Sequence, residues 1–202
     1  MIRFGVLASG GGSNFQALAD GLRGDSNAKL SVVVCNVPGA KVIDRASAAG
    51  VPSVVLDHKT FTSREAFDEK LVATLKEHGV EWVCLAGYMR LVTPIFLRAF
   101  PGRVINIHPA LLPAFPGMHG VRQAINAGVK IAGCTIHFVD EGMDTGPIIA
   151  QAAVPVLPGD DESKLGARIQ IEEHRLYVKV VKDIAAGRLS LEGRKVSLRD
   201  AL

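Results

Sequence analysis

Two polar side chains interrupt an apolar run at residues 104–108. The run reads Val-Ile-Asn-Ile-His, so Asn106 and His108 are separated by one residue. Because side chains alternate along a β-strand, both point to the same face. Pro109 and Pro113 follow, and since proline cannot donate to a sheet, the strand should end there and lead into a stiff segment. The pattern predicts an amide and an imidazole held on one chemically active face.

An acidic loop further along the chain supplies a third kind of group. Residues 139–147 read VDEGMDTGP, and Asp144 could reach His108 if the fold brings the two together. An amide donor, an imidazole and a carboxylate form a workable set for acyl transfer, in which negative charge develops on a carbonyl oxygen. Considered alone, a histidine in an apolar strand is more often a packed residue. The alternative for Asp144 is an ordinary acidic turn.

A glycine-rich segment lies near the amino end. Residues 9–14 read SGGGSN after the apolar run 2–8, and Phe15, Leu18 and Leu22 then recur at helical spacing. A strand, a glycine loop and a helix expose backbone N–H groups at a helix N-terminus, which suits a phosphate. A dinucleotide fingerprint would need a third glycine where Phe15 stands, and a P-loop would need Gly-Lys-Ser/Thr, so neither fits. A simple tight turn is the alternative.

Composition limits the class of protein. The chain has 202 residues, 48% hydrophobic and 21% charged, which predicts one globular domain or at most two. A net charge of +3 permits anionic small molecules without indicating nucleic acid or a membrane. Cys35, Cys84 and Cys134 lie far apart in apolar runs, which suits a reducing compartment, and we expect Cys84 and Cys134 in the core. Since we find no signal peptide or long apolar stretch, we expect a soluble, cytoplasmic protein.

Strands and helices alternate along the first half of the chain. Strands are expected at 2–8, 30–37, 51–56 and 81–87, and helices from Phe15, at 40–49 before Gly50, at 62–79 and from Pro94. This order favours a single-domain, Rossmann-like α/β fold, with a mostly parallel twisted sheet and helices on both faces. Ligands bind such sheets beyond the carboxyl ends of the strands. The glycine loop, residues 86–92 and His108 should therefore share one rim.

The second half should end in an antiparallel portion. A short helix is expected at 121–127, extended segments at 131–139 and 146–156, a long helix at 160–186 and a hairpin in the tail 188–202. We expect one domain over 1–202, with a phosphate-binding half at 1–100, a catalytic half with a second ligand site at 101–187, and the tail at 188–202.

Two predicted helices carry further candidate residues. Arg64 lies in a first turn, where a cation opposes the helix dipole, so a ligand carboxylate could compensate it. A solvated surface charge is the alternative. Gln170 and Glu173 are three residues apart on one side of the long helix, where substrate hydroxyl groups could meet them. An exposed polar face is the alternative there.

The motifs together are similar to those of the folate-dependent formyltransferases. The pattern runs Asn-x-His-Pro-x-Leu-Leu-Pro from Asn106, Pro-Gly-x-His from Pro116 and Asp-x-Gly-Pro from Asp144, behind the glycine-rich segment. Order and spacing agree from about residue 2 to about residue 190. Within the family, the chain resembles the members that act on phosphoribosylglycinamide in purine biosynthesis. The resemblance implies that the first and fourth strands are neighbours in the sheet.

The resemblance also implies an activity and a set of residues. A formyl group would pass from the co-substrate 10-formyltetrahydrofolate to the primary amine of phosphoribosylglycinamide, with that amine as the nucleophile and no metal. The Asn106 amide and a protonated His108 would stabilise the formyl oxygen, while Asp144 holds the imidazole charged and oriented. The implied substrate-binding residues are Gly12, Ser13, Asn14, Gln170 and Glu173. The implied folate-binding residues are Arg64, Met89, Arg90, Leu91, Val92, Asn106, Asp140 and Asp144.

One departure and two alternatives accompany this interpretation. Gly120 and Val121 follow His119, where some relatives have a further histidine, so a second imidazole there would be dispensable. A formyltetrahydrofolate hydrolase-like enzyme is one alternative, although an extra amino-terminal domain would be usual for it. A non-catalytic module that binds a sugar phosphate or nucleotide is the other. The expected partners are small molecules, with neither nucleic acid nor a membrane, and the protein would be a monomer or a homodimer.

Overall fold

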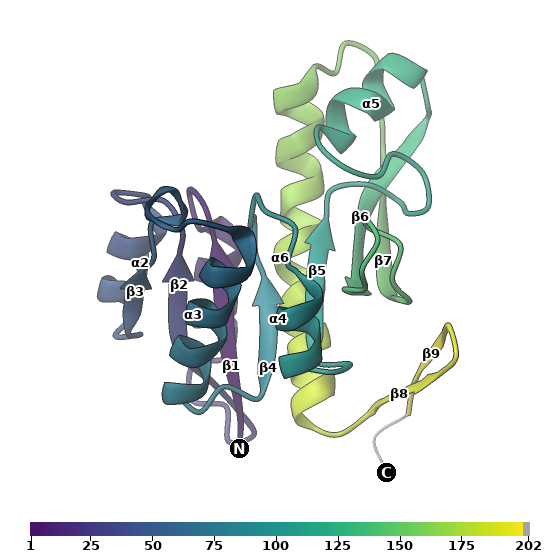
Figure 1. Ribbon diagram of the computed structural model, residues 1–202. Coiled ribbons are helices and arrows are strands. Elements are labelled where there is room, and N and C mark those ends of the chain that lie inside the picture. The colour runs from purple at the N-terminus through teal and green to yellow at the C-terminus, as the bar shows by residue number, and fades with distance from the viewer. Residues whose placement is uncertain (200–202) are drawn as a thin grey trace. The chain divides into compact units, whose positions relative to one another are not determined.

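The chain forms two compact units. A computed structural model describes residues 1–199 of the chain (Figure 1). Within them, the first unit is Met1–Ile105 and the second begins at Asn106. The division falls inside strand β5 (Val104–His108), whose bounds are those expected from the sequence. The boundary between the two halves that the sequence predicts, after residue 100, lies slightly before this division. The assignment of one domain to the whole chain remains a prediction.

The first unit contains four parallel strands. They are β1 (Ile2–Ala8), β2 (Ala28–Cys35), β3 (Ser53–Val55) and β4 (Trp82–Leu85), in the order β3-β2-β1-β4. The predicted pairing of the first and fourth strands is thus confirmed. Strand β2 begins earlier than expected because Asp25 ends the preceding turn by accepting the Ala28 N–H at 3.1 Å. Strand β3 is shorter than expected, and within this unit only β2 pairs with it.

Helices α1 (Ser13–Gly21), α2 (Val42–Ala48), α3 (Arg64–Glu77) and α4 (Pro94–Ala99), with a 3₁₀ turn at His58–Thr60, complete this unit. Ser63 caps α3 as expected, because its hydroxyl accepts the Ala66 N–H at 3.0 Å. The predicted stripe of Phe67, Leu71 and Leu75 is fully buried. A Cβ at Gly5 of β1 would lie 2.8 Å from Leu75 Cδ2, so the glycine allows α3 to pack closely on the sheet.

The second unit joins an antiparallel pair to a long helix. Strands β6 (Ile131–Phe138) and β7 (Ile148–Pro155) pair antiparallel, and α6 (Glu162–Ala185) packs on both. Helix α5 (Gly120–Ala127) contacts α6, as Figure 1 also shows. The predicted hairpin is confirmed as β8 (Leu189–Glu192) and β9 (Lys195–Leu198). Residues 200–202 of the predicted tail lie outside the described residues.

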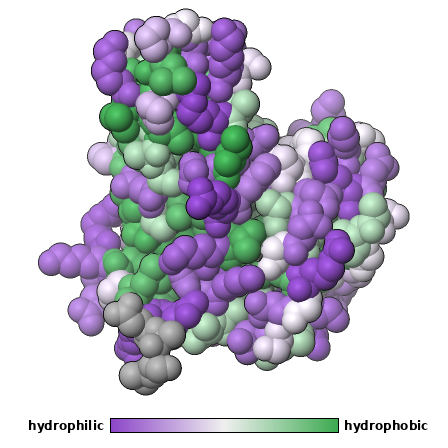
Figure 2. Space-filling view, turned by 180° about the vertical axis from the view of Figure 1, so that it is seen from behind, coloured by the Kyte–Doolittle hydropathy of each residue, from purple (hydrophilic) through white to green (hydrophobic). Residues whose placement is uncertain are grey.

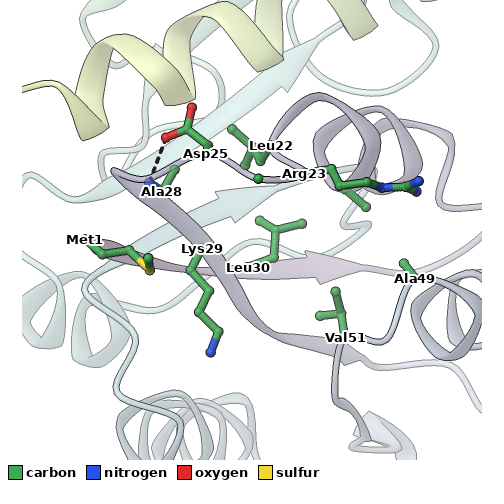
Figure 3. A pocket seen from close by; sticks show the side chains of 11 residues that line it. Met1, Leu22, Arg23, Asp25, Ala28, Lys29, Leu30, Ala49 and Val51 are labelled. Atoms are coloured by element: carbon green, nitrogen blue, oxygen red, sulfur yellow. Dashed lines mark hydrogen bonds between the residues drawn. The ribbon is translucent and has the colours of Figure 1, made fainter.

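Surface features add little that is specific. Hydrophobic residues are exposed among polar ones in the view from behind (Figure 2), and the second unit exposes Leu157 and Ile171. A pocket of about 260 Å³ in the first unit lies by the start of β2. Its lining includes Arg23 and Lys29 (Figure 3), but none of the predicted site residues. In residues 1–199, no helix has the length and apolar character needed to cross a membrane.

Candidate active site

Strands β5 and β6 carry a cluster of polar side chains. The Asn106 amide nitrogen lies 3.2 Å from Nε2 of His137 on β6. His108 and His137 are buried, with 4% and 2% of their surface exposed. His137 is a residue that the sequence motifs do not single out. Like His108, His137 is an imidazole within an apolar run, and this is the signal that the sequence offers. Unlike His108, it is not followed by a proline motif.

Asp144 joins the two imidazoles. It lies in the loop between β6 and β7, and its Oδ2 is 3.3 Å from His108 Nδ1, while its Oδ1 is 3.5 Å from His137 Nε2. Oδ2 also accepts the Gly117 N–H at 2.7 Å. The structure therefore brings together Asn106, His108 and Asp144, and adds His137 between the amide and the carboxylate.

The surroundings of Asp144 favour its ionised form. Burial raises the pKa of Asp144, but hydrogen bonds from His137 and from the Gly117 N–H lower it, as do the charges of His108 and His137. The pKa of this carboxyl group is consequently below its ordinary value. Asp144 is thus a carboxylate near neutral pH.

Both ring nitrogens of His108 face oxygen atoms. Its Nε2 lies 2.8 Å from the Phe115 carbonyl, to which it donates, and its Nδ1 faces Asp144. Because Nε2 already carries a hydrogen, a proton at Nδ1 would make the ring an imidazolium, which would form an ion pair with Asp144. The Phe115 carbonyl therefore occupies Nε2, the ring nitrogen that does not face Asp144, whereas the resemblance implies that His108 stabilises a substrate oxygen. Gly120 covers this bond, since a Cβ there would lie 3.3 Å from Nε2 and from the Phe115 oxygen.

His137 has a choice of partner at Nε2. Its Nδ1 lies 2.7 Å from the Phe138 carbonyl and donates to it. In the neutral ring Nε2 is then an acceptor and takes a hydrogen bond from the Asn106 amide. In the charged ring Nε2 carries a proton and donates to Asp144 instead. His137 can therefore either orient Asn106 or stabilise the carboxylate.

Replacing His137 by Leu should raise the pKa of Asp144. The substitution removes a hydrogen bond and a charge that lower this pKa, and leaves the burial that raises it. Carbon-13 NMR titration of the Asp144 carboxyl group in both proteins measures the change, with circular dichroism to verify the fold. An identical titration in the two proteins would mean that His137 does not act on Asp144.

The loop that carries Asp144 is tied at both of its ends. Asp140 accepts hydrogen bonds from the Thr145 hydroxyl at 2.6 Å and from the Gly142 N–H at 3.2 Å. Arg194, in the turn between β8 and β9, donates to the Thr145 carbonyl at 2.6 Å. The tail, for which the sequence predicted no chemistry, thus contacts the residue next to Asp144.

In the first unit, the glycine loop is held from two sides. Gly12 has φ of +72° and precedes α1, and a Cβ there would lie 2.6 Å from Val42 Cγ2 and 2.9 Å from Val42 Cα. Arg45 donates from Nε to the Gly11 carbonyl at 2.9 Å. A glycine is therefore required at residue 12 by its backbone conformation and by the close approach of α2.

The glycine loop and residues 86–92 are adjacent, as expected. The Ser9 N–H donates to the Gly87 carbonyl at 3.0 Å, and the Ser9 hydroxyl accepts the Met89 N–H at 2.9 Å. The same hydroxyl donates to the Asn36 side-chain oxygen at 2.6 Å. These bonds bring the two predicted binding loops of this unit together. His108 belongs to the second unit.

Helix α3 holds the segment that contains Met89 to Val92. Arg64 donates to the Leu91 carbonyl at 2.8 Å and so braces this segment, while the residue itself is exposed. Asp68 is buried and accepts the Thr93 N–H at 2.6 Å. The Arg90 guanidinium lies 4.8 Å from the centre of the Phe67 ring. Met89 and Leu91 stay exposed, as residues that could meet a flat apolar ligand.

The two candidates on α6 differ in burial. Gln170 is exposed and Glu173 is buried, so the alternative of an exposed polar face is wrong for Glu173. Burial, and next the charge of Glu173, raise the pKa of the Cys134 thiol to about 12. Cys84 and Cys134 are both fully buried, which confirms their place in the core. Within residues 1–199, no group of three or more candidate side chains is arranged to hold a metal ion.

Comparison with known proteins assigns the family. Residues 2–181 match the formyl transferase family. The chain is 47% identical over 185 residues to phosphoribosylglycinamide formyltransferase of Bacillus subtilis, covering 91% of this chain and 95% of that protein. It is 50% identical over 190 residues, 93% of this chain, to the trifunctional purine biosynthetic protein adenosine-3 of Drosophila pseudoobscura pseudoobscura, but spans only 14% of that protein's length.

A solved structure agrees with the sequence relatives. Glycinamide ribonucleotide transformylase 1 from Symbiobacterium toebii is 52% identical and superposes with a TM-score of 0.97, covering 99% of this chain and 95% of its own. The predicted α/β fold, mostly parallel with an antiparallel carboxy-terminal portion, is confirmed. On the extent of the match and the level of identity, the chain belongs to the formyl transferase family.

Proposed function

We propose that this protein transfers the formyl group of 10-formyltetrahydrofolate to the primary amine of phosphoribosylglycinamide. The observation that carries the proposal is the contact of one carboxylate, Asp144, with two buried imidazoles, one of which meets the Asn106 amide. Relatives named for this reaction support it. The substrate amine attacks the formyl carbon, so the protein has to stabilise charge on the formyl oxygen and needs no nucleophile of its own.

Asn106 is proposed as the hydrogen-bond donor to that oxygen. Its amide nitrogen has two hydrogens, and when His137 is neutral one of them is directed to His137 Nε2. The second can then point to the formyl oxygen. Because the amide is oriented before the substrate arrives, no reorganisation is needed when charge develops.

His108 is proposed to act as a cation. Its contacts with Phe115 and Asp144 suit a doubly protonated ring, which places positive charge beside the developing oxyanion. For a direct hydrogen bond, the formyl oxygen has to replace the Phe115 carbonyl at Nε2. Without that exchange, His108 contributes its charge alone. In both cases Asp144 maintains the orientation and the charge of the ring.

The remaining assignments concern binding. We propose that the first-turn N–H groups of α1 hold the phosphate, since a helix N-terminus favours an anion. The segment braced by α3 presents Met89 and Leu91 to the folate. The proposed substrate-binding residues are Gly12, Ser13, Asn14, Gln170 and Glu173, and the proposed folate-binding residues are Arg64, Met89, Arg90, Leu91, Val92, Asn106, Asp140 and Asp144.

Replacing Gly12 by Ala should raise KM for phosphoribosylglycinamide by about tenfold or more, and KM for the folate much less. The added Cβ would meet Val42 and require a left-handed backbone, so the loop would have to move away from its phosphate-binding conformation. Steady-state kinetics with each substrate varied in turn measures both constants.

The matched control is Gly11→Ala. Gly11 has no heavy atom within 4 Å of a Cβ position and its φ is not in the left-handed region, so this variant should keep both KM values. Equal increases of the two KM values in the Gly12 variant would show that the loop is general scaffolding rather than a phosphate site.

Release of tetrahydrofolate, followed spectroscopically, tests the proposed function. Turnover that requires phosphoribosylglycinamide supports formyl transfer, whereas turnover without the amine supports the hydrolase alternative. Binding of the sugar phosphate without turnover supports the non-catalytic module. A cytoplasmic location, the absence of a metal and a monomeric or homodimeric state remain predictions.

A further inference from the structure

We propose that Gln151 and Thr135 position His108 for the proposed reaction by fixing the segment that follows it. Neither residue belongs to the proposed set of catalytic or binding residues, and the inference rests on the proposed function. The two face each other across the antiparallel pair, Thr135 on β6 and Gln151 on β7.

The Thr135 hydroxyl is fully used in this arrangement. The side chain is completely buried, and its Oγ1 donates to the Ala110 carbonyl at 2.7 Å. It accepts the Leu112 N–H at 3.0 Å and one Gln151 amide hydrogen at 3.0 Å. A hydroxyl has one donor and two acceptor sites, so this one has no capacity left.

The Gln151 amide uses both of its hydrogens. Besides the bond to Thr135, its Nε2 donates to the Leu112 carbonyl at 2.8 Å. Ala110 and Leu112 are themselves buried, so their backbone groups cannot find water as substitute partners without rearrangement. Three hydrogen bonds thereby fix the backbone just beyond His108, and a fourth joins the two side chains.

The fixed segment leads directly to the partners of the site. Phe115, three residues beyond Leu112, provides the carbonyl that accepts from His108 Nε2, and Gly117 provides the N–H that Asp144 accepts. Phe115 has φ of +56°, a conformation that a non-glycine residue keeps only when its surroundings impose it. Release of the backbone at Leu112 would let this carbonyl move and His108 turn. Gln151 and Thr135 thus act through the segment, as positioning residues.

Gln151→Glu is the sharpest substitution. It keeps the shape of the side chain but replaces two donated hydrogens by carboxylate oxygens, which cannot donate to the Leu112 carbonyl. Gln151 is exposed as a residue, so the core should remain intact.

We expect kcat of Gln151→Glu to fall about fivefold to tenfold, the effect of losing one or two hydrogen bonds, while both KM values stay within about twofold. Ala153→Ser, at an exposed residue on the same face of β7, is the matched control and should leave kcat unchanged.

Thr135 provides a rescue test. Thr135→Ser keeps the hydroxyl and should keep most of kcat, whereas Thr135→Val keeps the shape and should lose it, with both KM values preserved. NMR signals of the His108 ring in the free protein should shift in Gln151→Glu and Thr135→Val but not in Thr135→Ser.

The outcomes separate the two proposals. Unchanged His108 signals in Gln151→Glu, or an unchanged kcat where wild type is active, would overturn the positioning role. If the wild type shows no formyl transfer, the proposed function fails, and the His108 signals still decide whether the two residues position this ring.

Discussion

His108→Ala is expected to lower kcat by about 10²-fold or more and to leave the affinity for phosphoribosylglycinamide nearly unchanged. The imidazolium acts on charge that develops only in the transition state, and groups of this kind contribute to kcat rather than to ground-state binding. Steady-state kinetics gives kcat, and isothermal titration calorimetry gives the binding constant of the sugar phosphate.

A control distinguishes a catalytic from a structural loss. His108 is buried and bonded to Phe115, so the variant has to be shown to fold by circular dichroism and thermal unfolding. His78→Ala removes an imidazole outside the cluster, at the end of α3, and should keep full activity. A folded His108→Ala protein with near-normal kcat would show that the ring is structural.

Asp144→Asn is expected to lower kcat by about 10²-fold at neutral pH. The amide is nearly the same shape but carries no charge, so it cannot stabilise an imidazolium at His108. If its nitrogen took the place of Oδ2, it would face the Gly117 N–H, which it cannot accept. Steady-state kinetics at neutral pH measures the fall in kcat. An unchanged kcat would show that Asp144 has no catalytic role and simply belongs to an acidic turn.

The same substitution should change how stability depends on pH. Because the pKa of Asp144 is lowered in the folded protein, its carboxylate stabilises the fold above the ordinary carboxyl range, near pH 3.9. That contribution is lost as the pH falls through the lowered pKa. The difference in unfolding free energy between wild type and Asp144→Asn, measured by denaturant at several pH values, should therefore shrink toward acid. A difference that does not vary with pH would contradict the lowered pKa.

Local pattern explains which elements the sequence could predict. Alternation and proline placed β5 at Val104–His108, and helical spacing identified the buried stripe of α3. These features depend on neighbours within a few residues. The predicted ends of β2 and β3 are less accurate. The start of β2 depends on the hydrogen bond that the Asp25 carboxylate accepts from the Ala28 N–H, and the length of β3 depends on pairing with a distant strand.

The site residues also separate into those that a local pattern predicts and those that depend on distant contacts. The sequence nominated Asn106 and His108 because they share one strand face, and Asp144 because of a motif. It could not show that Asp144 meets a second imidazole, since that contact depends on how β6 returns as β7. Nor could it show that the Phe115 carbonyl occupies His108 Nε2, because backbone acceptors have no signature in the sequence.

The fate of a labelled formyl group tests the central claim most directly. Wild-type protein is incubated with 10-formyltetrahydrofolate carrying carbon-13 in the formyl group, with and without phosphoribosylglycinamide, and the products are followed by carbon-13 NMR. The proposed function predicts that the label appears as an amide on phosphoribosylglycinamide, together with tetrahydrofolate, and that nothing is consumed when the amine is omitted. Label appearing as free formate at the same rate with and without the amine would contradict it.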